Sequence, residues 1–90
     1  MDIQQALHDY IVQQAAEKAP ADLDADYDLI ESGLMDSLFM MGIITHLETQ
    51  YQVQFGLNDI VPQNFRSIRT LTEFVRRTIA GEAATASSGD

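Results

Sequence analysis

The decisive stretch of this sequence is ESGLMDSLFMMGIITHLETQY, residues 31–51, where an acidic loop meets the most apolar helix-like segment of the chain. Gly33 interrupts the local pattern just before a helix can begin. Beyond it, apolar residues recur at helical spacing as Met40, Ile43, Ile44, Leu47 and Tyr51. This spacing predicts a helix from Ser37 to about Gln52, with the Ser37 hydroxyl beside the first free N–H groups of the helix.

An amphipathic segment precedes this stretch. Residues 2–18 carry apolar side chains at the spacing of one helical face, namely Ile3, Leu7, Tyr10 and Ile11. Pro20 should end this helix, because the residue before a proline disfavours the helical backbone region. We therefore expect a first helix from Asp2 to about Lys18.

A third amphipathic segment lies near the end of the chain. Ser67 or Thr70 can cap its start, and Gly81 should end it. Its apolar stripe consists of Ile68, Leu71, Phe74, Val75 and Ile79. Just before it, residues 63–66 should form one helical turn anchored by Phe65.

Three such helices and one turn share a single core most simply as an all-α fold, a small antiparallel bundle. Residues 20–36 would span one side of it as a long loop, held in an ordered path by apolar residues among its acids. We expect one domain over residues 1–80. Residues 81–90 are small and polar, and they should form a disordered tail.

The composition of the chain argues against several classes of function. The 90 residues carry a formal charge of −9, which disfavours binding to nucleic acid or anionic membranes. There is no cysteine, so no disulfide or thiolate metal site is possible. Asp22, Asp24 and Asp26 resemble the opening of a calcium loop, but Tyr27 stands where its glycine should be, so we expect no metal site. No targeting or membrane segment is evident, and we expect a cytoplasmic monomer.

Ser37 is the side chain best placed for chemistry. It lacks the flanking glycines of a nucleophile elbow, and neither His8 nor His46 is near it in sequence, so we expect no catalysis by the isolated chain. A serine at a helix start can instead receive a phosphate, which the helix N-terminus stabilises. Asp36 could bind the metal ion that an incoming transferase uses. The alternative is that Ser37 merely caps the helix, a common use of serine.

The residues around Ser37 predict a surface for partners. Leu38, Phe39 and Met41 lie at or beyond the edge of the core stripe, and exposed clusters of this kind often bind other proteins. Phe39 could equally pack beneath the acidic loop, and both interpretations remain open. We also assign Leu34 and Met35, just before the helix, to the predicted partner contacts.

Residues 33–38, GLMDSL, resemble the motif of acyl and peptidyl carrier proteins, in which Asp-Ser-Leu follows a Gly-Leu or similar pair. The likeness extends from the first helix through DYDLIESGL to Ile68-Arg69-Thr70-Leu71, covering roughly residues 3–79. It implies the four-helix bundle of that family. It also implies that a phosphopantetheinyl transferase attaches 4′-phosphopantetheine to Ser37, with Asp36 assisting the Mg-dependent transfer.

In this family the cofactor thiol carries acyl or aminoacyl groups as thioesters between enzymes. The resemblance thus implies a non-catalytic carrier loaded by an adenylating ligase or an acyltransferase. Carriers of primary fatty-acid synthesis are strongly acidic along the second helix, whereas this chain offers only Glu48 there. We therefore expect a stand-alone carrier of a specialised pathway of the polyketide or nonribosomal peptide type. The alternative function is an unmodified helical adaptor that binds enzymes through the apolar start of its second helix.

Overall fold

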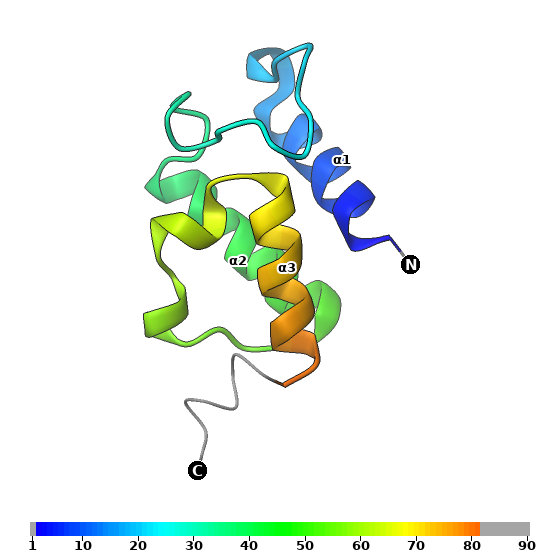
Figure 1. Ribbon diagram of the computed structural model, residues 1–90, viewed down its shortest axis with the longest axis vertical. Coiled ribbons are helices and arrows are strands. Elements are labelled where there is room, and N and C mark those ends of the chain that lie inside the picture. The colour runs from blue at the N-terminus through cyan, green and yellow to red at the C-terminus, as the bar shows by residue number, and fades with distance from the viewer. Residues whose placement is uncertain (1, 82–90) are drawn as a thin grey trace.

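The computed structural model describes residues 2–81, and these form three α-helices. They are α1 (Ile3–Ala15), α2 (Ser37–Tyr51) and α3 (Ile68–Ile79), which Figure 1 shows joined by long connecting segments. Short 3-10 turns occur at Ala16–Lys18, Leu57–Asp59 and Pro62–Phe65. The all-α prediction is confirmed. The four-helix description is wrong for the described residues, because the would-be fourth helix is the single turn Pro62–Phe65.

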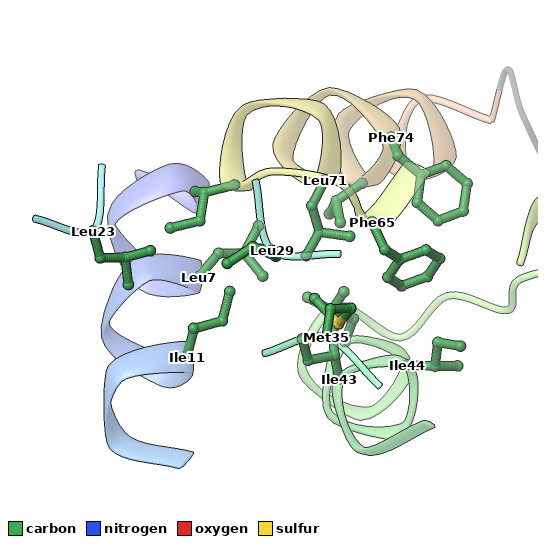
Figure 2. Packing of buried hydrophobic residues seen from close by; sticks show 13 residues of the cluster. Leu7, Ile11, Leu23, Leu29, Met35, Ile43, Ile44, Phe65, Leu71 and Phe74 are labelled. Carbon is green, nitrogen blue, oxygen red and sulfur yellow. The ribbon is translucent and has the colours of Figure 1, made fainter. Parts of the chain in front are cut away.

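The core lies where the three helices face one another (Figure 2). Leu7 and Ile11 enter it from α1, and Ile43 and Leu47 enter it from α2; each is at most 1% exposed. The loops complete the core with Leu29, Phe65 and, at 6% exposure, Met35. Phe65 lies against Phe74 of α3, with ring centroids 6.0 Å apart. The predicted turn anchored by Phe65 is therefore confirmed.

The buried face of α3 differs from the predicted stripe in its last turns. Ile79 is 45% exposed, whereas Thr72 and Thr78 are buried. Their hydroxyls donate to the carbonyls of Ile68 and Phe74, at 2.7 and 3.0 Å. A threonine that satisfies its hydroxyl within its own helix can be buried without an unpaired polar group, which apolar spacing alone does not reveal.

Residues 20–36 are ordered, as the sequence predicted, because backbone hydrogen bonds fasten them to the start of α3. The N–H of Leu29 donates to the carbonyl of Arg66 at 2.7 Å, and the N–H of Arg69 donates to the carbonyl of Ala25 at 2.9 Å. Leu29 then points into the core (Figure 2), and Leu23, at 9% exposure, belongs to the same buried cluster. The loop is thus held from both sides, by apolar burial and by main-chain bonding.

Two ion pairs reinforce the same junction. Arg69 contacts Asp26, and Arg66 contacts Asp28 at 3.0 Å. Hydrogen bonds from Arg69 lower the pKa of the Asp26 carboxyl. The backbone N–H of Glu31 and the Arg66 guanidinium likewise lower the pKa of Asp28. Two of the loop's carboxylates are therefore structural.

The ends of α3 follow the sequence signals. Ser67 is the N-cap, and its hydroxyl accepts from the N–H of Thr70, while the Thr70 hydroxyl accepts from the N–H of Ser67. Gly81, with φ of 88°, follows the last turn. The remainder of the predicted tail, residues 82–90, lies outside the described residues. Across residues 2–81, no helix is both long and apolar enough to span a bilayer.

Candidate functional site

The start of α2 is capped by Asp36. Its Oδ1 accepts from the N–H of Phe39 at 2.8 Å, and its carbonyl accepts from the N–H of Met40 at 2.9 Å. Ser37 is therefore the first residue of the helix, and the interpretation of Ser37 as the N-cap is wrong. Because helical bonding begins at Met40, the N–H groups of Ser37 and Leu38 lie beyond the ladder of α2.

The loop before Asp36 determines where Ser37 lies. Gly33 has a φ of +85°, a left-handed conformation that glycine adopts without steric cost. After it, the N–H of Met35 donates to the carbonyl of Leu29 at 2.8 Å. The buried side chain of Met35 then anchors the chain one residue before Asp36. The position of Ser37 thus depends on a turn, a core residue and a cap in succession.

The structure separates the predicted partner residues into two groups. Leu38 is 84% exposed and Met41 is 54% exposed, as expected of a surface that meets other proteins. Phe39 and Leu34 are partly buried and pack against the core. Met35 is 6% exposed, so we remove it from the partner contacts: its side chain supports the loop from within.

The exposed face of α2 carries no carboxylate. Glu48 is the one acid in this helix, and its Oε2 accepts from the N–H of Phe55 at 3.1 Å, in a partly buried position. His46 stacks on Tyr10 of α1, with ring centroids 4.0 Å apart. The exposed face of α2 beyond Ser37 is therefore apolar and neutral, and the acid next to Ser37 is Asp36, before the helix.

A groove runs between α1 and α2, next to Ser37. Its first part has a volume of about 250 Å³ and is lined by Tyr10, Gln14, Asp36, Leu38, Phe39 and Gly42. A second hollow of about 220 Å³ shares Gln14, Asp36 and Phe39 and extends beneath Gly33 and Leu34 to Lys18. Within residues 2–81, no three His, Cys, Asp or Glu side chains gather as metal ligands.

Sequence reasoning missed the α1 wall of this groove. Apolar spacing places Tyr10 on the core stripe, yet its hydroxyl donates to the carbonyl of Gly42 at 3.3 Å across the groove. A tyrosine on a core stripe is a usable signal, because its hydroxyl needs a polar partner when the ring is packed. Nothing in the sequence indicated that Gln14 would line the groove.

Comparison with family models finds one that covers residues 6–75, described as "Phosphopantetheine attachment site". The chain belongs to this family. Carrier domains of the family hold 4′-phosphopantetheine covalently. They interact with phosphopantetheinyl transferases and biosynthetic enzymes, and they are in general not catalysts themselves.

This phosphopantetheine-attachment domain also resembles a solved chain in "Crystal structure of FAD-dependent dehydrogenase". The two are 32% identical with a TM-score of 0.69, and the match covers 77% of this chain and 97% of that chain. The matched chain is therefore the shorter of the two. A comparison with curated protein sequences finds no significant match.

The geometry at the start of α2 fits the cofactor of the family. The Ser37 side chain is exposed, and capping is done by Asp36, so the hydroxyl is not needed to start the helix. Two N–H groups outside the helical ladder and the positive end of the helix dipole favour an anionic phosphate here.

Proposed function

We propose that this chain is a carrier whose Ser37 receives 4′-phosphopantetheine from coenzyme A and then carries acyl or aminoacyl thioesters between enzymes. The observation that carries this proposal is that Asp36, and not Ser37, caps the start of α2. Asp36 caps the helix through its bond to Phe39, which leaves the Ser37 hydroxyl exposed beside unbonded N–H groups. A group attached to Ser37 therefore leaves the cap of α2 intact.

The transfer is a phosphoryl-group exchange in which the hydroxyl is the acceptor. The Oγ of Ser37 forms a bond to the phosphorus that bears pantetheine, and the pyrophosphate bond of coenzyme A breaks. Adenosine 3′,5′-bisphosphate is the leaving group, and a base of the transferase takes the hydroxyl proton. The attached group supplies a thiol, a function this cysteine-free chain does not have. Asp36 assists as a ligand of the magnesium ion used by the transferase, and its second carboxylate oxygen remains for that role.

The test is intact mass after incubation with coenzyme A, Mg²⁺ and a broad-specificity phosphopantetheinyl transferase. The wild-type chain should gain one phosphopantetheine group, and Ser37→Ala should gain none. Ser32→Ala is the matched control, because Ser32 is an exposed serine of the same loop, and it should still be modified. A wild-type chain of unchanged mass, or a gain that survives Ser37→Ala, overturns the proposal.

We further propose that the pathway is specialised and includes an FAD-dependent dehydrogenase as a client. Two observations support this client: the similar chain belongs to a crystal structure of an FAD-dependent dehydrogenase, and Leu38 and Met41 form a neutral, apolar face. Thioester formation acidifies the hydrogens next to the carbonyl. A flavin enzyme can then remove a proton from that carbon and a hydride from the next, leaving an unsaturated thioester and reduced flavin.

This client is tested with the dehydrogenase of the similar structure as the probe enzyme. Its flavin should bleach without oxygen when the holo chain carries a saturated acyl or aminoacyl group, and not when the chain is apo. Leu38→Glu should slow the bleaching, whereas Thr49→Glu, on an exposed position three turns further along α2, should not. No bleaching with any saturated cargo rejects this class of client.

The adaptor function keeps one observation in its favour, the exposure of Leu38 and Met41 on an uncharged face. It predicts that Ser37→Ala preserves pathway output while Met41→Glu reduces it. The carrier proposal predicts that both changes reduce output. Measuring product formation with these two variants separates the two functions.

A further inference from the structure

We propose that the groove between α1 and α2 holds the neutral part of the attached arm, with Tyr10 as its end wall. This inference rests on the proposed attachment at Ser37. The groove consists of Tyr10, Gln14, Asp36, Leu38, Phe39 and Gly42. Asp36 and Leu38 are the two sequence neighbours of Ser37, so the groove opens directly at the point of attachment.

The contacts between the two helices explain why space remains there. Tyr10 bridges α1 to α2 through a 3.3 Å hydrogen bond to the carbonyl of Gly42 and through its stack on His46. Around this bridge lie hollows on both sides: the groove toward Ser37, and a second hollow of about 260 Å³ toward Gln50 and Tyr51. Tyr10 thus divides the space between α1 and α2.

Gly42 lines the groove without a side chain. A Cβ built at this position would lie 3.8 Å from the hydroxyl oxygen of Tyr10, so a side chain here would project toward Tyr10 into the groove. Within a helix, glycine is less favourable than alanine by about 1 kcal/mol, so its presence at an exposed position needs a local reason. Space for an occupant is such a reason.

The lining matches the chemistry of the arm. Pantetheine carries a pair of methyl groups and two amides, and the groove offers the ring of Phe39 and the side chain of Leu38 beside the amide of Gln14 and the hydroxyl of Tyr10. The carboxylate of Asp36 at the mouth repels the phosphate, which keeps that charge at the end of the helix. Only the neutral part of the arm therefore enters.

The tether favours the arm over a segment of another protein. A group attached next to the groove meets it at an effective concentration that reaches millimolar, so even weak contacts are populated. The part of the groove that Tyr10 closes has a volume of about 250 Å³, below the roughly 300–1,000 Å³ of pockets that enclose a whole ligand. The cargo accordingly stays near Tyr10, outside the core, where enzymes can reach it.

The test compares amide and side-chain chemical shifts of ¹⁵N-labelled apo and holo chains. Holo formation should shift Tyr10 and Gln14, which are remote in sequence from Ser37, and the methyl protons of the arm should show contacts to the rings of Phe39 and Tyr10. Gly42→Leu should remain fully modified but lose the shifts on α1. Thr45→Leu, an exposed neighbour on the same helix, should retain them.

Shifts confined to residues 35–40 in the wild-type holo chain overturn the groove, as do α1 shifts that persist in Gly42→Leu. Should Gly42→Leu fail to fold, the wild-type chain alone is the test: contacts between the arm and the rings of Phe39 and Tyr10 support the groove, and their absence overturns it. A chain that gains no phosphopantetheine mass instead rejects the proposed function, so the two failures are distinguishable.

Discussion

Arg69 at the start of α3 donates two hydrogen bonds to the carboxylate of Asp26, from Nε at 2.6 Å and from Nη2 at 3.0 Å. Together with Arg66 and Asp28, this contact joins the loop that leads to Ser37 to the third helix. The acidic loop is thus more than a solvated charged segment. The carboxylates of Asp26 and Asp28 fix the conformation of the loop through their arginine partners.

The first prediction concerns acid stability. Since the pKa values of Asp26 and Asp28 are lowered in the folded chain, the unfolded chain takes up protons first as the pH falls. The stability these groups contribute is complete above the unfolded pKa of about 3.9 and is lost as the pH falls through the lower folded values. Asp26→Asn should flatten this acid dependence in urea denaturation between neutral and strongly acidic pH. Asp22→Asn, outside both ion pairs, should leave it unchanged.

The second prediction distinguishes the capping residue Asp36 from the proposed attachment residue Ser37. Asp36→Ala removes the acceptor of the Phe39 N–H and should lower the free energy of unfolding by about 1 kcal/mol. Ser37→Ala, one residue later, should leave stability nearly unchanged, because its side chain does not cap the helix. Chemical denaturation of both variants checks this. Equal losses would mean that Ser37 also supports the fold.

The third prediction compares two glycines. Gly33→Ala places a side chain in the left-handed region, where it should cost about 1 kcal/mol through backbone strain alone, since no atom lies within 4 Å of the added Cβ. Gly42→Ala lies in α2 and should be stabilising by up to about 1 kcal/mol. Opposite shifts in melting temperature are expected. A stabilising Gly33→Ala would contradict the conformation described at that turn.

The fourth prediction concerns the core. Phe74 is 1% exposed and stacks on Phe55 at 4.9 Å, so Phe74→Ala should destabilise the chain by about 3–5 kcal/mol. Leu57→Ala is the control, because Leu57 is 89% exposed and should change stability little. The pair is compared by thermal unfolding. A small effect of Phe74→Ala would show that the core is placed wrongly.

Much of the fold was predictable because apolar spacing directly reports helical faces. The second helix begins at Ser37 as predicted, and Ser67 caps the last helix, one of the two residues proposed for that role. Apolar spacing did not predict the burial of Thr72 and Thr78, because each of these hydroxyls donates to a carbonyl of its own helix. The assignment of Met35 to the partner surface was wrong, because the sequence just before a helix has no periodicity from which burial could be predicted.

The site was predictable only in part. Its position at the helix start and the resemblance both indicated Ser37 as the candidate, but the sequence did not show that Asp36 caps the helix through a hydrogen bond to Phe39. The ion pairs of Asp26 and Asp28 join residues 43 and 38 positions apart, and no local pattern encodes such partners. The α1 wall of the groove was missed for the same reason.

If Ser37 is the attachment site, as proposed, these long-range partners also determine when the chain can be modified. The loop before Ser37 is fastened to Arg66 and Arg69, so its path cannot close on a ribosome-bound chain that has not yet released the start of α3. A transferase that recognises the folded start of α2 would find no substrate in such a nascent chain. Under the proposed function, attachment of the cofactor to Ser37 should therefore follow the folding of this loop onto α3, so that only chains with a complete third helix carry a thioester.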